Sequence, residues 1–454
     1  MKKIFFSLVC FCFCTFLFAQ NDNGFKSLFD GKTLNSWKRV VGSGEYSVKD
    51  SMIVGTTVAG SPNSFLVTEA EYSDFILEMD VKLDDTASNS GVQIRSHFNA
   101  NENNGKGRVY GYQFEEDGSS RRWSGGIYEE GRRGWLYPVT LNPMAHGAFE
   151  FGKFNHIKIE AIGNEIKTWV NNIPVAHLID SVSNKGFIAL QVHAVGKPED
   201  AGKKMYWKNI RIKTTDLKPS DFPNDVFIVN NIPNSVSASE QQQGWKLLFD
   251  GKTSNGWKGA YKPGFPEKGW TIKDGTITVL SSQGKEAANG GDIVTTEEYS
   301  AFELSFEFKL TPGANSGVKY FVTLSENNPG SAIGLEYQVL DDKLHPDAKL
   351  GRAGNRTMSS LYDLIPAVKS ERFYNKPGEW NHGRIVVYPN NHVEHWLNGI
   401  KVLEYERGSQ VFEALVAVSK YHVWDHFGEA PKGHVLLQDH GNEVSFRSIK
   451  IRML

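Results

Sequence analysis

One phrase occurs twice in this chain, and the repeat limits the possible folds more than any other feature. GFKSLFDGKTLNSWK runs from Gly24 to Lys38 and GWKLLFDGKTSNGWK from Gly244 to Lys258, with eleven of fifteen positions identical. Three later pairs keep the same order: SNSGVQIR with ANSGVKYF, KTWVNN with EHWLNG, and WKNIRIK with FRSIKIR. Because solenoid repeats recur every ~20–50 residues, this single long offset indicates duplication of a whole domain.

The copies suggest the domain boundaries. We predict a first domain over residues 21–217, a linker over residues 218–243 and a second domain over residues 244–454. The linker is rich in Pro, Ser, Asn and Gln, and we expect its apolar run Val226–Ile228 to touch both domains. A chain of 454 residues suits two or three domains.

Apolar residues alternate with polar ones throughout both copies. DFILEMDVKL in the first copy and AFELSFEFKL in the second follow a period of two, which is typical of strands with one buried face. HIKIEAIGNEIKTWV and RIVVYPNNHVEHWL each read as a hairpin, with turns at Gly163-Asn164 and Pro389–Asn391. We therefore predict an all-β chain of two antiparallel β-sandwiches, each closed by its last strand against the strand of the LFDGKT phrase.

The first twenty residues have the pattern of a secretory signal peptide. Lys2 and Lys3 precede a short apolar run that ends at Ala19, and all three cysteines lie in this segment. We expect a periplasmic or secreted protein without thiol chemistry and without a membrane span. Without the two lysines, 48 basic side chains face 52 acidic ones with no charge block, so we expect no nucleic-acid partner.

The parity of each strand separates core residues from residues of an outer face. In FIALQVHA, GYQFEE and SGVQIR, the apolar residues share one face and leave polar residues on the other. The polar residues of the first copy are Gln93, Arg95, Gln113, Glu115, Gln191 and His193.

The same parity in the second copy gives Glu336, Gln338, Gln438 and His440. We match Gln113 with Gln338. In this match Glu115 follows Gln113 by two residues in the first copy, whereas Glu336 precedes Gln338 by two residues in the second. Lys319 and Phe321 stand at the places of Gln93 and Arg95. The sequence therefore predicts one scaffold with two diverged sites.

Simpler explanations exist for these residues. A solvated sheet face also carries Gln, Glu and His. Trp169 and Trp396 occupy matched positions, where they either stack on a sugar ring or close the edge of the sandwich. Both alternatives stay open from the sequence.

The quoted motifs, with SGGIYEEGRRGW (Ser124–Trp135) and the closing KNIRIK, resemble the 3-keto-disaccharide hydrolase family, also called domain of unknown function 1080. The resemblance covers both copies. It implies concanavalin A-like jelly rolls that act on glycosides whose C3 hydroxyl has been oxidised to a ketone. A base would remove the acidified C2 proton, and the enolate would then expel the substituent on C1.

The resemblance suggests roles for the polar residues. His193 or His440 is a candidate base, and Glu115 or Glu336 a base or the ligand of a divalent cation. Arg95, Arg132 or Arg133 would stabilise the oxyanion, and Tyr128 or Tyr362 would protonate the leaving oxygen. The glutamines Gln113, Gln191, Gln338 and Gln438, with Trp169 and Trp396, would hold the sugar.

We favour the second copy as the catalyst, because Asp439 lies next to His440 in the chain and could orient it. The first copy has Val192 at that place and would mainly bind the substrate. The alternative is a non-catalytic protein with two lectin-like domains. The partner in either case is a small carbohydrate.

Overall fold

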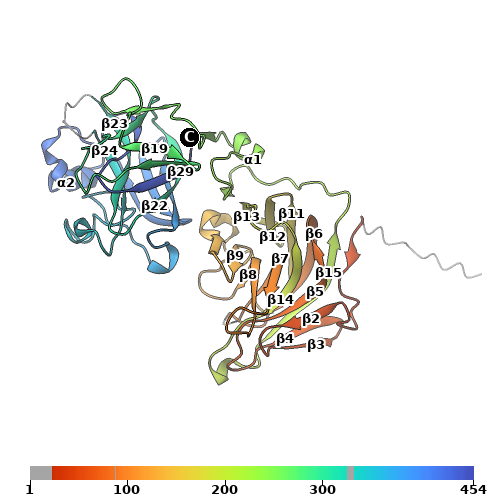
Figure 1. Ribbon diagram of the computed structural model, residues 1–454. Coiled ribbons are helices and arrows are strands. Elements are labelled where there is room, and N and C mark those ends of the chain that lie inside the picture. The colour runs from red at the N-terminus through yellow and green to blue at the C-terminus, as the bar shows by residue number, and fades with distance from the viewer. Residues whose placement is uncertain (1–22, 87, 325–331) are drawn as a thin grey trace, which may run out of the picture.

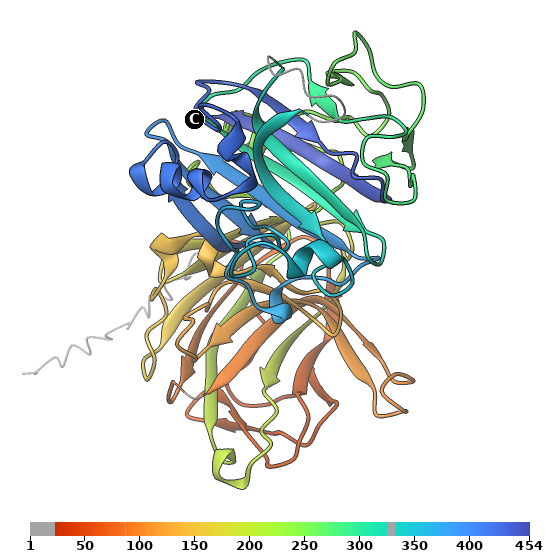
Figure 2. The ribbon, with the colours of Figure 1, turned by 90° about the vertical axis from the view of Figure 1, so that its left-hand side faces the viewer.

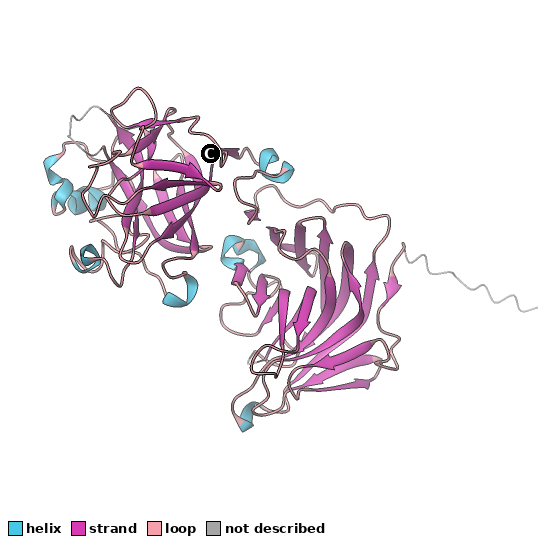
Figure 3. Cartoon of the chain, viewed as in Figure 1, coloured by secondary structure: helices cyan, strands magenta, loops and turns pink. Residues whose placement is uncertain are grey.

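The structure, a computed structural model, describes residues 23–86, 88–324 and 332–454. The predicted signal peptide, residues 1–20, lies outside the described residues. Strands dominate, and the short helices lie in connections between them (Figure 3). The strands form two separate sandwiches (Figure 1), so the predicted all-β, two-sandwich fold is confirmed.

The first domain consists of two facing sheets, which we call its back sheet and its front sheet. The back sheet has the order β16 (Val229–Asn230), β13 (Ile173–Ile179), β12 (Glu165–Val170), β11 (Asn155–Ile162), β6 (Phe75–Leu83), β15 (Lys204–Lys213), β4 (Met52–Thr56), β3 (Glu45–Lys49), with β1 (Lys26–Ser27) beside β15. The front sheet has the order β10 (Gly134–Tyr137), β9 (Ile127–Glu130), β8 (Arg108–Asp117), β7 (Asn89–Asn99), β14 (Gly186–Val192), β5 (Ser64–Tyr72), β2 (Trp37–Val40).

The second domain repeats this arrangement with fewer strands. Its back sheet has the order β19 (Trp270–Lys273), β20 (Thr276–Val279), β29 (Val444–Met453), β22 (Phe302–Leu310), β25 (Trp380–Val387), β26 (His392–Leu397), β27 (Ile400–Glu406), with β17 (Lys246–Leu247) beside β29. Its front sheet has the order β18 (Trp257–Gly259), β21 (Ile293–Thr295), β28 (His434–Leu437), β23 (Asn315–Thr323), β24 (Ile333–Leu340).

Helices are few among the described residues. The α-helices are α1 (Ala238–Gln242) and α2 (Gln410–Ala417). The 3-10 turns are η1 (Val139–Leu141), η2 (Pro143–Ala145), η3 (Pro198–Asp200), η4 (Pro346–Lys349), η5 (Glu371–Phe373) and η6 (Lys420–Val423). No helix in the described part of the chain has the length and apolar character needed to cross a bilayer.

Each core lies between the two sheets of its domain. In the first domain Leu77 and Met79 of β6 pack with Val92 of β7, and all three are fully buried. Phe306 of β22 contacts Tyr337 of β24 in the second domain, with an edge-to-face distance of 5.2 Å between ring centroids. The alternating pattern thus selects the residues that the sandwich buries.

The repeated phrase has a structural role in both copies. Asp30 accepts backbone hydrogen bonds from Lys32 and Thr33 at 2.8 and 2.7 Å, and Asp250 accepts the matching pair at 2.7 Å each. This turn follows β1 and β17, which pair with β15 and β29 as predicted. Asp-Gly-Lys-Thr therefore forms the turn that follows the first strand of each sandwich.

The connecting segment packs against both domains. The Tyr137 hydroxyl donates to the Phe227 carbonyl at 2.9 Å, and the guanidinium of Arg384 lies 4.4 Å from the centre of the Phe227 ring. Glu240 of α1 is fully buried and pairs with Lys450 of β29. Consequently the connecting segment contacts both sandwiches, which lie next to each other in Figure 2.

Candidate functional site

The strand register relates the two front sheets. In the first domain Gln93 of β7 lies opposite Gln113 of β8, and Gly91 lies opposite Glu115. The side chains of both β8 residues point away from the core, because Tyr112 and Phe114 on either side of Gln113 are in it.

The second domain has the same frame with different residues. Lys319 of β23 lies opposite Glu336 of β24, and Gly317 lies opposite Gln338. Gln113 therefore corresponds to Glu336, and Glu115 to Gln338. Our match of Gln113 with Gln338 is wrong by two residues: the carboxylate and the amide exchange places between the domains.

The glycine of the shared Asn-Ser-Gly-Val motif makes room for the first of these side chains. A Cβ on Gly91 would lie 2.5 Å from Cδ of Gln113, and a Cβ on Gly317 would lie 2.5 Å from Oε1 of Glu336. Any side chain at either glycine would therefore displace the side chain of Gln113 or Glu336. The motif thus fixes where Gln113 and Glu336 lie on the sheet.

In the first domain the carboxylate is held by amides. The side-chain nitrogen of Asn89 donates to Oε1 of Glu115 at 2.9 Å, and that of Gln113 donates to Oε2 at 2.7 Å. Gln113 in turn accepts a short hydrogen bond from Gln93. Burial raises the pKa of Glu115 to about 7, although both amide hydrogen bonds act in the opposite direction. Both oxygens of this carboxylate are therefore engaged by the protein.

Gln191 and His193 lie at the end of β14. The buried amide of Gln191 has no hydrogen-bond partner for either polar atom in the described chain. His193 is half-buried, its Nδ1 lies 2.9 Å from the Ala194 carbonyl, and burial lowers its pKa. No hydrogen bond joins its ring to Glu115 among the described residues.

Arg95 does not lie on the outer face. A bulge between Ile94 and His97 interrupts the pairing, and Arg95 has a left-handed φ of 46°. Its fully buried guanidinium donates to the carbonyls of Ser73 and Gly163 and to Asp74. The alternation rule fails at the bulge, and the predicted substrate contact of Arg95 is wrong because its donors are used inside the fold.

The remaining candidates of the first domain are scattered. Tyr128 of β9 lies opposite Gln113, on the predicted face. Arg132 pairs with the buried carboxylate of Glu129 at 2.6 Å. Trp169 of the back sheet is covered by Lys158, 4.2 Å from its ring, and by Phe222, so a sugar cannot stack on it there.

The second domain gathers charged groups around Glu336. This carboxylate is 4% exposed, and it accepts no hydrogen bond from any described residue. Burial raises its pKa, and the ammonium groups of Lys319 and Lys420 oppose that rise. Unlike Glu115, Glu336 thus accepts no hydrogen bond in the described chain, and the charges of two ammonium groups act on it. The ammonium of Lys319 also donates to the Ala332 carbonyl at 3.2 Å and lies 3.9 Å from Asp292.

Lys420 and Tyr362 come from connections outside the front sheet. Nζ of Lys420 lies 4.2 Å from the centre of the Tyr362 ring, and burial lowers the pKa of this lysine. The Tyr362 hydroxyl donates a hydrogen bond to the carboxylate of Asp347 at 2.8 Å. The guanidinium of Arg356 donates to Asp347 at 2.9 Å and to Asp363 at 2.7 Å, and so links the two carboxylates. The backbone N–H of Lys420 also donates to Asp363, which fixes η6 beside the sheet.

His440 and Asp439 do not form a pair. Asp439 is fully buried and accepts hydrogen bonds from the backbone N–H groups of Gly290, Gly291 and Gly441. The prediction that Asp439 orients His440 is therefore wrong: its carboxylate holds a glycine loop. Nδ1 of His440 is buried without a partner in the described chain, and its ring lies 5.8 Å from that of His345. Burial lowers the pKa of His440.

Three further candidates belong to the second domain. Gln338 and Gln438 are buried, and each has one side-chain atom without a partner among the described residues: Nε2 of Gln338 and Oε1 of Gln438. Such atoms are the ones expected to meet a solute or an ordered water. Trp396 lies instead in the back sheet, where its indole N–H donates to Glu394 at 2.8 Å.

Sequence parity missed several residues of this cluster. Lys420, Asp347, Arg356 and His345 lie in loops or short 3-10 turns, where no period assigns a face. Two local sequence features could have pointed to this cluster. His345 precedes a proline that begins a 3-10 turn, and Tyr362 belongs to the sequence Leu-Tyr-Asp-Leu.

The candidate metal ligands do not converge on either face. Within the described residues, the one group of three close metal-binding side chains is His392, Glu394 and Glu404, on the β26–β27 hairpin. Nζ of Lys401 lies 3.2 Å from Glu394 and 2.5 Å from Glu404, so an ammonium group already balances these carboxylates. This group lies outside both front sheets.

Comparison with known proteins shows which family the chain resembles. A model of the 3-keto-alpha-glucoside-1,2-lyase-like domain matches residues 24–213 and 244–452. A 3-keto-disaccharide hydrolase of Bacteroides thetaiotaomicron is 39% identical over 243 residues, which are 49% of this chain and 82% of the relative.

Two solved structures are also similar. A putative glycosyl hydrolase of Parabacteroides distasonis is 29% identical, with a TM-score of 0.42, over 49% of this chain and 99% of that one. A carbohydrate-binding module of Bacillus subtilis is 19% identical, with a TM-score of 0.27, over 39% and 95%. Given the two matched segments, the chain belongs to the 3-keto-alpha-glucoside-1,2-lyase-like domain family, and it carries that domain twice.

Proposed function

We propose that the second domain cleaves the glycosidic bond of 3-keto-glycosides by elimination, with Glu336 as the base. The carrying observation is the carboxylate itself: it is buried and unbonded within the described chain, Lys319 lies opposite it on the next strand, and the charge of Lys420 acts on it. Burial raises its pKa, so the ionised form is a stronger base than an exposed glutamate. The relative named a 3-keto-disaccharide hydrolase supports the substrate class.

The reaction balances without an oxidant or a reductant. Glu336 takes the proton from C2, and the electron pair of that bond forms an enolate with the C3 ketone. When the C3 carbonyl reforms, a double bond forms between C1 and C2 and the bond from C1 to the leaving oxygen breaks. Lys319 would stabilise the enolate oxygen, and Lys420, whose pKa burial lowers, would give the leaving oxygen its proton. Water added to the double bond would complete a net hydrolysis.

The test uses the full chain with both anomers of 4-nitrophenyl 3-keto-glucoside and with the parent glucosides. We expect nitrophenol from a keto substrate only, loss of deuterium placed at C2, and a primary isotope effect. Glu336→Gln should lower turnover about 10²–10⁴-fold, the range for a lost general base. The matched control Glu115→Gln should retain it.

Three outcomes would contradict the proposal. Cleavage of the parent glucosides at the same rate would remove the role of the ketone. Retention of deuterium at C2 would exclude elimination. Saturable binding of the keto substrates without cleavage would instead support the lectin-like alternative, which the two amides bound to Glu115 already favour for the first domain.

We also infer that the chain is exported. Lys2, Lys3 and the apolar run before Gln20 support this, as argued from the sequence. Amino-terminal sequencing of the protein from its native host should find a start close to Gln20. A start at Met1 would contradict export by this route.

A further inference from the structure

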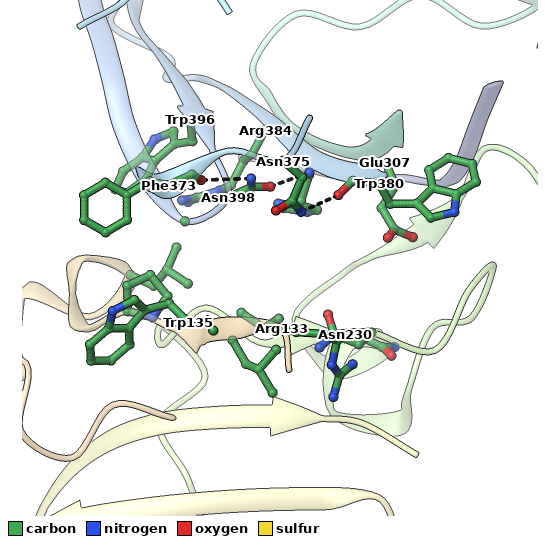
Figure 4. Close-up of a pocket in the computed structure, with 18 of the residues that line it drawn as sticks. Arg133, Trp135, Asn230, Glu307, Phe373, Asn375, Trp380, Arg384, Trp396 and Asn398 are labelled. Atoms are coloured by element: carbon green, nitrogen blue, oxygen red, sulfur yellow. Dashed lines mark hydrogen bonds between the residues drawn. The ribbon is translucent and has the colours of Figure 1, made fainter. Parts of the chain in front are cut away.

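A cavity of about 820 Å³ lies between the two domains. The first domain contributes Tyr128 and Trp135, the second contributes Arg372, Phe373 and Trp380, and the connecting segment contributes residues 227–231. Figure 4 shows Trp135 and Phe373 on opposite walls at the same end of this cavity. Its volume is in the upper part of the ~300–1,000 Å³ range of small-molecule sites.

Tyr128 is the residue that the cavity shares with the front face of the first domain. This residue lines the cavity and also lies opposite Gln113 on the neighbouring strand. The charges of Glu115 from the first domain and of Arg372 from the second both act on the Tyr128 hydroxyl. A ligand on the front face near Glu115 would therefore extend past Tyr128 into the cavity.

Aromatic rings from both domains meet at this end. Trp135 lies edge-to-face with Trp123 and with Tyr128, with centroid distances of 4.8 and 5.5 Å. Phe373 of η5 reaches across the interface and lies 5.8 Å from Trp123. The second domain thus supplies one ring of an aromatic wall that otherwise belongs to the first domain.

The same end holds one donor that the protein leaves unused. Arg372 is exposed and forms no ion pair among the described residues; its guanidinium lies 5.2 Å from the centre of the Phe373 ring. Arg121 does not line the cavity: its guanidinium lies 5.0 Å from the ring of Trp123 and pairs with Asp117 at 3.1 Å. By contrast, Arg447 of the same cavity donates two hydrogen bonds to Glu307.

We propose that the interdomain cavity is a saccharide-binding site, in which Arg372 and Phe373 of the second domain extend the front face of the first domain for an oligosaccharide longer than a disaccharide. Aromatic faces stack on sugar rings, and arginine and amide groups bond their hydroxyls. The first domain is then a binding unit that is complete only when the second domain is present. The proposal shares with the proposed function only the premise of a carbohydrate ligand.

The test measures binding by calorimetry in the full chain carrying Glu336→Gln, which removes turnover from the readout. The probes are unoxidised glucose di- and tetrasaccharides with α-1,4, β-1,4 and β-1,3 linkages. In at least one series the tetrasaccharide should bind at least about tenfold more tightly than the disaccharide, as one additional well-placed contact predicts. If no series shows this dependence on length, the proposal is overturned.

Variants then locate the extra contact. Arg372→Met and Phe373→Ala should each remove the preference for the tetrasaccharide and leave disaccharide binding unchanged. Their controls are Lys376→Met in the same loop and Val411→Ala on α2, both at exposed positions. A preference that survives both Arg372→Met and Phe373→Ala would overturn the proposal.

A variant of the first domain guards against a general folding effect. Tyr128→Phe should weaken binding of the tetrasaccharide, because its hydroxyl lies on the wall of the same cavity as Arg372. Unchanged tetrasaccharide binding in Tyr128→Phe would overturn the shared site. Turnover of 3-keto-glucosides by the unmodified chain is measured in a separate experiment. A protein that lacks this activity can therefore still show the binding proposed here, and the two proposals are tested independently.

Discussion

The two front sheets share a backbone but differ in where the carboxylate lies. Gly91 and Gly317 hold the same place, and the side chain that covers each glycine is Gln113 in one domain and Glu336 in the other. Two residues along the strand, the order is reversed, with Glu115 against Gln338. A duplicated fold can therefore keep two polar positions on a strand and still change its chemistry.

The neighbours of each carboxylate explain the consequence. Glu115 is bonded by Asn89 and Gln113 and has amides around it, whereas Glu336 accepts no hydrogen bond from the described residues and has Lys319 directly opposite. Amides suit sugar hydroxyls. A free carboxylate beside ammonium groups suits proton transfer and an enolate.

The largest effect should come from exchanging the two residues in the second domain. Glu336→Gln with Gln338→Glu gives that domain the order of the first domain, and turnover should fall about 10²–10⁴-fold because the base moves away from Lys319. Steady-state rates with a 3-keto-glucoside measure this. The reverse exchange in the first domain, Gln113→Glu with Glu115→Gln, is the control and should leave turnover unchanged; equal losses in both would show that the comparison is mistaken.

Replacing the cation should have the next largest effect. Lys319→Gln copies Gln93 of the first domain and should lower kcat about 10²-fold, as for the loss of one donor to a developing oxyanion. KM should change less, because the charge develops only in the transition state. A change in KM alone would mean that Lys319 serves substrate binding.

The histidines give a smaller contrast. His440 lies near the charges of Lys420 and Asp347, so His440→Ala should lower turnover roughly tenfold through a disturbed site. His193→Ala should change turnover by no more than about twofold, because the hydrogen bond of its ring is with the backbone carbonyl of Ala194. If His193→Ala removes turnover and His440→Ala does not, catalysis belongs to the first domain.

The smallest effect concerns stability in the first domain. Glu116 points into the core, where it is fully buried beside Ser90 and Trp207, with neither oxygen well bonded, and burial raises its pKa to about 8. Between pH ~4.5 and ~8 the folded state keeps a proton that the unfolded state releases, so the free energy of unfolding should fall as the pH rises.

Glu116→Gln removes this proton and should flatten that decline by about 2 kcal/mol or more. Urea titrations at pH 5 and pH 8 compare the two proteins. The exposed control Glu69→Gln should follow the unmodified chain. A decline of the same size in Glu116→Gln would assign it to other groups, of which Glu115 acts in the same direction.

Much of the fold was predictable because alternation is a local property. The hairpins around Gly163 and Asn390, the cores and the outward faces of Gln113 and Glu336 all follow from a period of two. The position of Arg95 was predicted wrongly because a β-bulge reverses the face to which its side chain points, and the alternation of apolar and polar residues does not reveal a bulge.

The candidate site was less predictable because it depends on contacts distant in the chain. Lys420 reaches Glu336 from η6, more than 80 residues along the chain, and Asp439 turns to a loop that ends at Gly291. Adjacency in sequence favoured a pair of Asp439 and His440 that the backbone does not allow.

The short strand β16 has a consequence for assembly. It pairs in parallel with β13, through Leu178 with Val229 and Ile179 with Asn230, and so occupies the outermost position of the back sheet. An open edge strand offers unpaired N–H and C=O groups to another chain. The connecting segment therefore caps a sheet as well as joining two domains, and a first domain cut before residue 229 should form concentration-dependent aggregates through the exposed β13.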